Sequence, residues 1–122
     1  MQTLLQAMAR QEGYYAPGTL PARRENPGDI EEGEFAQAHG ALPPDGNRFA
    51  AFPDAATGFA AMTALLTDHY LGLTLEEALN KWAPPVENNV NAYLANVMEF
   101  TGLTADTVLT TGIINGDTGS PP

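Results

Sequence analysis

The feature that most constrains this chain is the stretch of residues 14–54, which proline or glycine interrupts every few positions. The interrupting residues are Pro17, Gly18, Pro21, Pro27, Gly28, Gly33, Gly40, Pro43, Pro44, Gly46 and Pro53. Proline lacks a backbone N–H, and glycine loses more conformational freedom on folding than other residues, so neither suits a helix interior. Long helices are therefore excluded here, and we expect a loop-rich lobe.

Two segments of this lobe are short enough to be strands. They are residues 34–37 and 48–52, and Asp45-Gly46 between them is a dipeptide typical of tight turns. We therefore expect the lobe to contain a short β-hairpin.

Outside the lobe, apolar residues recur with a helical period between polar capping residues. Thr3 is expected to cap a first helix that Gly13 ends. Asp54 is expected to cap a long core helix that ends at Gly72. These two helices flank the loop-rich stretch on either side.

The remaining helices are expected after residue 73. Thr74-Leu75-Glu76-Glu77 has the pattern of a capping box, and the helix that it starts should end at Pro84-Pro85. A further helix should begin at Glu87, Asn88 or Asn89 and end at Gly102, followed by a short turn over residues 104–109.

These elements predict a mostly α chain of the α+β kind, with a helical core and a small loop-rich lobe. At 122 residues and 43% apolar residues, one domain is expected at 1–115, with 116–122 as a polar tail. Cysteine is absent, and His39 and His69 lack the spacing of a zinc motif. We therefore expect a monomer without a cofactor or metal.

The chain is strongly acidic, with 15 acidic against 5 basic residues and a net charge of −10. That charge repels a polyanion, so nucleic acid is not an expected partner. No apolar run approaches the roughly 18 to 20 residues that span a bilayer, so no membrane partner is expected either. The charge favours an acidic working pH on an anionic substrate, or else serves only to keep the surface hydrated.

Glu12 is the first candidate for chemistry. Glycoside hydrolysis needs a protonated carboxylic acid at the leaving oxygen, commonly with a second carboxylate about 5 to 9.5 Å away. Glu12 ends the first expected helix, where the partial negative charge of the helix terminus opposes an ionised acid. It also borders the aromatic pair Tyr14 and Tyr15. Because a glutamate at a helix end is usually only a solvated charge, the surrounding motifs must decide its role.

Those motifs resemble a phage and bacterial family of the lysozyme-like superfamily over roughly residues 3 to 110. That family typically has Glu-Gly after the first helix, then an Asn-Asn-Pro-Gly-Asn-Ile loop, a Phe-x-x-Phe strand and a Gly-aromatic helix. The matching segments here are Ala9-Arg10-Gln11-Glu12-Gly13, Arg23-Arg24-Glu25-Asn26-Pro27-Gly28-Asp29-Ile30, Arg48-Phe49-Ala50-Ala51-Phe52, Thr57-Gly58-Phe59, Lys81-Trp82-Ala83-Pro84-Pro85, Glu87-Asn88-Asn89 and Tyr93.

The resemblance implies a lysozyme-like fold and a muramidase (lysozyme) activity, with Glu12 as the general acid. The substrate would be bacterial peptidoglycan, cut at the β-1,4 bond between N-acetylmuramic acid and N-acetylglucosamine. The resemblance also places Asn26 and Gly28 in a loop opposite Glu12. There Asn26 would offer amide donors to the sugar, and Gly28 would let the backbone come close to it. The protein would act on the cell wall, either secreted or phage-associated.

The chain departs from the family at Asp29, where the family usually has asparagine. Asp29 could be the second carboxylate, steadying an oxocarbenium ion or positioning water, or simply a turn residue after Pro-Gly. Rival second carboxylates are Glu25, Glu31, Glu32 and Glu34, although such an acidic run is usually a solvated face. If no carboxylate reaches Glu12, a lytic transglycosylase that releases anhydro products becomes the better interpretation.

Further residues are candidates for binding substrate. Tyr15 and Trp82 have flat rings that suit the apolar side of a pyranose, although Trp82 is better explained as a core residue. Arg48 could hold carboxylates in place or meet those of the substrate. Asn88 could contact sugar amides or cap a helix, and Tyr93 could approach Glu12 or pack in the core.

Two other classes of function stay open at this point. One is a non-catalytic cell-wall-binding or virion structural module that shares the fold, because a fold does not determine a function. The other is an inhibitor or adaptor whose acidic surface meets a basic protein.

Overall fold

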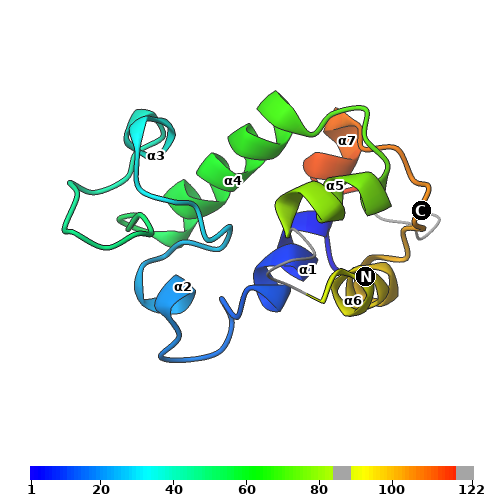
Figure 1. Cartoon of the computed structure of the whole chain (residues 1–122), viewed down its shortest axis with the longest axis horizontal. Coiled ribbons are helices and arrows are strands. Elements are labelled where there is room, and N and C mark those ends of the chain that lie inside the picture. The colour runs from blue at the N-terminus through cyan, green and yellow to red at the C-terminus, as the bar shows by residue number, and fades with distance from the viewer. Residues whose placement is uncertain (84–88, 118–122) are drawn as a thin grey trace. The chain divides into compact units, whose positions relative to one another are not determined.

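The structure is a computed structural model that describes residues 1–83 and 89–117 (Figure 1). This part of the chain is mostly helical and contains no sheet, only two isolated antiparallel bridges, Glu31–Phe49 and Thr74–Val108. Its helices are α1 (Leu4–Gln11), α2 (Leu20–Arg23), α3 (Glu34–Ala38), α4 (Ala55–His69), α5 (Leu75–Trp82), α6 (Val90–Thr101) and α7 (Thr111–Ile114). The prediction of a mostly α chain is confirmed.

The predicted helix starts are found where capping residues stand. The Thr3 hydroxyl accepts from the N–H of Gln6 at 3.2 Å, and the Asp54 carboxylate accepts from that of Thr57 at 2.8 Å. Thr74 and Glu77 form the complete capping box before α5. These bonds satisfy N–H groups that the first turn of a helix leaves without partners.

The later helix ends are also close to the predicted ones. Asn89 caps α6 by accepting from the N–H of Ala92, and Gly102 ends it in the left-handed conformation with φ of 74°. Glu87 and Asn88, the other proposed starts, and the predicted stop at Pro84-Pro85 lie outside the described residues. The short helices α2 and α7 were not predicted. Thr19 caps α2 by accepting from the N–H of Ala22, and Thr110 caps α7 by accepting from that of Ile113.

The predicted β-hairpin is wrong. Residues 34–37 belong to α3, and the segment that pairs with residues 48–50 is residues 30–32 instead. The N–H of Glu32 donates to the Arg48 carbonyl and that of Ala50 to the Ile30 carbonyl, each at 2.9 Å. Gln37 then donates from its side chain to the Leu42 carbonyl at 2.9 Å, which turns the chain back after the short helix.

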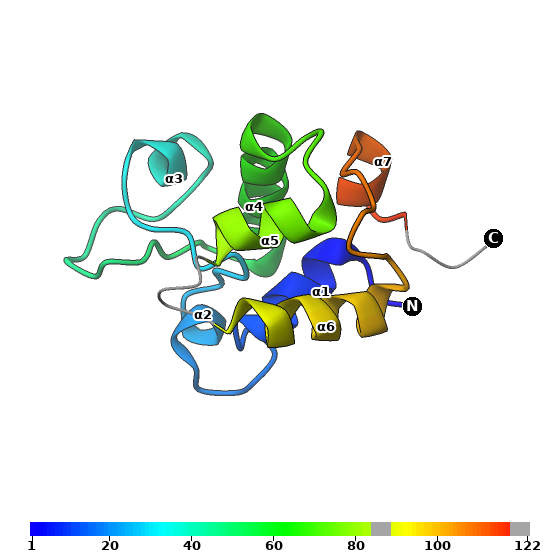
Figure 2. The same cartoon turned by 45° about the vertical axis from the view of Figure 1, so that its right-hand side comes forward.

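The described chain forms two compact units, one made of Met1–Ala7 with the chain from Leu66 onwards, the other of Met8–Leu65. In the first unit, α5 packs against α6 (Figure 2). The N–H of Leu75 donates to the Thr107 carbonyl at 2.8 Å, so residues 72–76 pair with residues 105–109. The buried apolar residues of this unit include Leu4, Leu66, Leu75, Leu79, Val97, Leu103, Leu109 and Ile114.

Lys81 closes the C-terminal end of α4 within the first unit. Its Nζ donates to the His69 carbonyl at 2.6 Å and lies 4.4 Å from the centroid of the Tyr70 ring. A cation is favourable at this end of a helix because the last carbonyls carry partial negative charge.

The second unit has a small core under its irregular segments. Its buried members are Ile30, Ala36, Ala50, Phe52 and Ala61, with Phe35, Ala41 and Leu65 packed against them. These residues come from α3, α4 and the segments around the Glu31–Phe49 bridge, so the core ties the loop-rich stretch to two helices.

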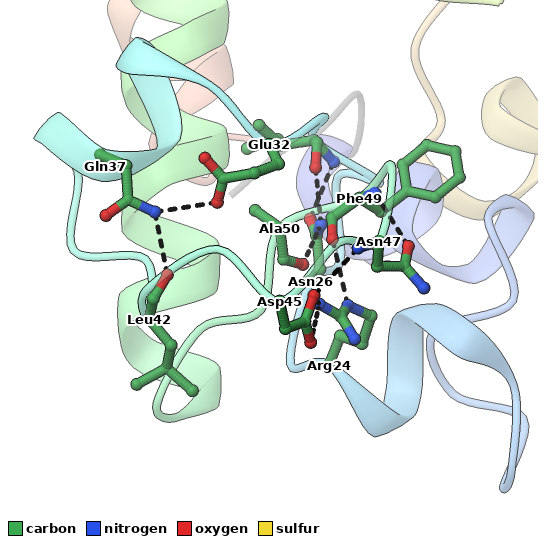
Figure 3. A network of polar contacts seen from close by, with 10 residues as sticks. Arg24, Asn26, Glu32, Gln37, Leu42, Asp45, Asn47, Phe49 and Ala50 are labelled. Carbon is green, nitrogen blue, oxygen red and sulfur yellow. Dashed lines mark hydrogen bonds and ion pairs between the residues drawn. The ribbon is translucent and has the colours of Figure 1, made fainter.

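Asn26 lies at the centre of this unit and is only 1% exposed (Figure 3). Its amide nitrogen donates to the carbonyls of Ile30 and Ala50, both at 2.9 Å. Its amide oxygen accepts from the N–H of Ile30 at 2.9 Å. One side chain therefore joins the loop before residue 30 to the segment at residue 50.

A second polar link runs beside Asn26 (Figure 3). The Arg24 guanidinium donates to both carboxylate oxygens of Asp45 at 2.8 Å and to the Phe49 carbonyl at 3.1 Å. The hydrogen bond from Arg24 is the main reason that the pKa of Asp45 lies below its usual value. Arg24 thus holds the exposed loop at residue 45 against the bridge.

Gly58 lets the loop at residues 25–27 approach α4 closely. A Cβ at this position would overlap the backbone oxygen of Glu25 and lie 2.9 Å from Cδ of Pro27. Only glycine fits there, because a backbone atom cannot move aside as a flexible side chain does.

Replacing Asn26 with alanine is expected to lower the free energy of unfolding by about 2 to 4 kcal/mol, because two carbonyls and one N–H would lose partners in a buried site. Urea unfolding measures this change. Asn80→Ala removes an exposed amide on α5 and should change stability by less than about 0.5 kcal/mol. Equal effects of the two substitutions would show that Asn26 has no special role.

Replacing Gly58 with alanine tests the close approach of residues 25–27 to α4, because the sign of the change in stability depends on it. Helix propensity alone predicts a gain of about 1 kcal/mol for this change, whereas the overlap with Glu25 predicts a loss of about 2 kcal/mol or more. Ala56→Gly, at an exposed position of α4, should lose about 1 kcal/mol by propensity alone. A Gly58→Ala protein that unfolds at a higher urea concentration than wild type would contradict the packing described here.

Candidate active site

Glu12 directly follows α1 and is its C-cap residue. Gly13 next to it has φ of 87°, a left-handed conformation that glycine adopts without strain. The N–H of Gly13 donates to the Arg10 carbonyl at 3.1 Å, and that of Tyr14 donates to the Ala9 carbonyl at 3.0 Å. This pair of bonds is a Schellman closure, so the backbone that carries Glu12 is held in place by hydrogen bonds on both sides.

The turn after Glu12 is closed by Thr19. The Thr19 hydroxyl donates to the carbonyls of Gly13 and Ala16, at 2.7 Å and 2.9 Å. The N–H of Ala16 also donates to the Gly13 carbonyl at 3.0 Å. Residues 12–19 are therefore a defined turn, and Glu12 itself is partly buried within it.

An aromatic cluster stands next to Glu12 in the chain. The Tyr14 ring meets the Tyr15 ring edge-on, with centroids 5.2 Å apart, and meets the Phe59 ring edge-on at 5.5 Å. Burial raises the pKa of Tyr14, and the nearby negative charge of Glu25 raises it further. The cluster thus joins Tyr15, which is exposed, to α4 and has a carboxylate beside it.

Asp29 is partly buried and has a left-handed backbone, with φ of 52°. Burial raises the pKa of its carboxyl group, and the positive charge of Arg48 opposes this shift. Arg48 also forms an ion pair with Glu31 at 2.7 Å and lies 5.0 Å from the centroid of the Phe49 ring. Arg48 thus interacts with the carboxylates of Asp29 and Glu31, which agrees with its expected role of holding carboxylates in place. Its other expected role, a contact with substrate carboxylates, stays a prediction.

Asn26 and Gly28 do not have the predicted role of contacting sugar. All three hydrogen-bonding atoms of the Asn26 amide are used inside the unit, and the side chain is buried. Gly28 is buried as well, and a Cβ there would lie 3.1 Å from Cγ of Met62. Both residues pack the interior of the unit instead of facing a ligand.

The candidates after residue 65 belong to the other unit. Trp82 is partly buried and meets the Tyr70 ring edge-on at 5.7 Å, which agrees with a core role. Tyr93 is 7% exposed on α6, so its ring is part of the interior. Asn88 lies outside the described residues, and the predicted approach of Tyr93 to Glu12 stays a prediction.

Two features of the site were not recognised in the sequence. Tyr14 and Phe59 are far apart in the chain, and only the fold brings their rings together. The strained backbone of Glu25, with φ of 49°, was not expected either, because glutamate rarely adopts this conformation. The one sequence signal for the cluster is the adjacent pair Tyr14-Tyr15 directly after Glu12-Gly13.

The described residues contain no group of three or more histidine, cysteine or acidic side chains placed to hold a metal ion. Within the same residues, no helix is long and apolar enough to cross a membrane.

Comparison of the sequence with protein-family models and with curated proteins finds no match.

Replacing Asp29 with asparagine is expected to stabilise the protein at pH 7. Because burial raises the pKa of Asp29 above its unfolded value, its ionisation opposes folding, and stability is lost as the pH rises through the folded pKa. Asparagine removes the charge and also suits a left-handed backbone. The gain should be at most about 1 kcal/mol at pH 7 and should vanish as the pH falls toward about 4.

Urea unfolding of wild type and Asp29→Asn between pH 7 and pH 4 measures this difference. Asp68→Asn changes the net charge equally at an exposed site on α4 and serves as the control. A loss of stability in Asp29→Asn at pH 7 would mean that the attraction to Arg48 outweighs burial.

Proposed function

We propose that this protein is a peptidoglycan-cleaving muramidase in which Glu12 is the general acid. The observation that carries the proposal is the position of Glu12 as the partly buried C-cap of α1, fixed by the Schellman closure at Gly13. The motif resemblance of the sequence names the substrate class.

A general acid has to hold its proton until the glycosidic oxygen takes it. The carbonyl groups at the C-terminal end of α1 carry partial negative charge, and this field opposes ionisation of a carboxyl group placed there. Partial burial acts in the same direction, because it removes water that would stabilise the carboxylate. A rigid turn also keeps the acid in one place relative to a bound glycan.

The reaction would begin with transfer of the Glu12 proton to the bridging oxygen while the bond from this oxygen to the anomeric carbon of N-acetylmuramic acid breaks. The electron pair of that bond goes to the leaving sugar, and an oxocarbenium-like centre remains. Water then adds to this centre and loses a proton. Asp29 is the candidate second carboxylate, because it is partly buried and lies in the field of Arg48.

Glu12→Gln is expected to reduce the rate of peptidoglycan cleavage by about 100-fold or more, because an amide cannot donate the proton. Purified cell walls would be digested at pH 4 to 7, and the released muropeptides identified by mass spectrometry. Glu99→Gln changes an exposed glutamate on α6 in the same way and should leave the rate within about twofold of wild type.

The products and rates separate the possible outcomes. Equal rates for wild type and Glu12→Gln would remove Glu12 from the mechanism, and anhydro products would assign the reaction to a lytic transglycosylase. Binding to the wall without release of muropeptides would support a non-catalytic wall-binding module. Asp29→Asn at more than half the wild-type rate would remove Asp29 as the second carboxylate.

A further inference from the structure

Tyr15 is an unusual residue on the surface of the second unit, because it is 52% exposed and its ring nevertheless packs against another aromatic ring. Its edge-on contact with Tyr14 and the contact of Tyr14 with Phe59 connect it to α4. The interplanar angles are 74° and 86°, a favourable geometry for aromatic pairs. The cluster therefore presents Tyr15 to solvent on a rigid base.

The backbone under Tyr15 is equally well defined. The Schellman closure precedes it, and the bonds of Thr19 to the carbonyls of Gly13 and Ala16 enclose it. A ligand that binds to such a side chain does not have to order it first, which lowers the entropy lost on binding. An exposed ring that is already fixed is a suitable platform for a flat apolar surface.

The charges around the cluster indicate which ligand it accepts. The backbone oxygen of Glu25 packs against Gly58, the residue before Phe59 in the cluster. From there the negative charge of Glu25 also raises the pKa of the Tyr14 hydroxyl. An anionic sugar on the ring would be repelled by Glu25, whereas a neutral pyranose presents C–H groups to the ring and no charge to Glu25.

We propose that Tyr15 is the stacking platform of a glycan subsite that binds an uncharged N-acetylhexosamine, with Glu25 selecting against anionic sugars. The inference rests on the proposed function, whose substrate alternates N-acetylglucosamine with a sugar that carries a lactyl group. Tyr15 follows Glu12 by three residues, so their Cα atoms are at most about 11 Å apart. This distance is shorter than a tetrasaccharide, so one glycan strand is long enough to reach both residues.

Binding of the neutral tetrasaccharide chitotetraose tests this subsite, measured by titration calorimetry in the Glu12→Gln protein so that cleavage does not interfere. Adding Tyr15→Ala should weaken binding about three- to tenfold, because the stacking surface is lost. Adding Tyr15→Phe should leave the affinity within about twofold, since the ring remains. Leu42→Ala, which removes another exposed apolar side chain of this unit, should have no effect.

A second binding experiment tests whether Glu25 excludes anionic sugars. Tetragalacturonate should not bind to the Glu12→Gln protein, and adding Glu25→Gln should make binding measurable while chitotetraose affinity stays within about twofold. Unchanged exclusion of tetragalacturonate in Glu25→Gln would overturn the role of Glu25.

Two results would overturn the subsite. They are equal chitotetraose affinity with and without Tyr15→Ala, and no binding of chitotetraose to the Glu12→Gln protein at all. Peptidoglycan digestion by wild type reports on the proposed function separately. Cleavage without Tyr15-dependent binding would refute the subsite alone, and Tyr15-dependent binding without cleavage would refute the activity alone.

Discussion

The hydrogen bonds of Asn26 are the interaction on which the second unit depends. Most of residues 14–54 lies outside regular structure, so few of its backbone groups are paired by a helix or a sheet. Asn26 satisfies groups of Ile30 and Ala50 in the interior and so fixes two distant segments against each other. The small core of this unit can then close beneath α3 and beside α4. A loop-rich stretch becomes ordered through one buried amide in place of a strand ladder.

The turn that follows α1 depends on the same kind of local bonding. Gly13 ends the helix and Thr19 closes the turn, so the proposed site residues Glu12, just before Gly13, and Tyr15, just after Tyr14, are both held by this bonding. The backbone of Glu12 is held by the Schellman closure at Gly13, and the Tyr15 ring packs on Tyr14, which in turn meets Phe59. One turn therefore carries both residues of the proposed site.

Local signals predicted the four longer helices, α1, α4, α5 and α6, because capping is a matter of a few adjacent residues. Thr3, Asp54, Thr74 and Asn89 each satisfy an N–H group that lies three positions further on, so the sequence shows both partners. The prediction of a β-hairpin was wrong for the opposite reason. A segment of four or five residues has little intrinsic preference, and the helix α3 is decided by the packing of its apolar residues into the core.

The site was predicted in part. The motif around Glu12-Gly13 places Glu12 correctly at the end of α1, because helix termination is local. The role of Asn26 was not predictable, since an asparagine before proline looks the same whether its amide faces solvent or two carbonyls from residues 30 and 50. The contact between Tyr14 and Phe59 likewise depends on the path of the chain between them. Sequence patterns predict contacts between residues within about one helical turn of each other, whereas these contacts join residues far apart in the chain.

The most direct test of the central claim is digestion of peptidoglycan in water enriched in oxygen-18, followed by mass spectrometry of the released sugars. A muramidase adds water to the anomeric carbon, so each new reducing N-acetylmuramic acid end should carry the heavy oxygen. Products that form without the label, as anhydro sugars do, would contradict hydrolysis. The absence of any released product would contradict the claim that this protein cleaves glycans.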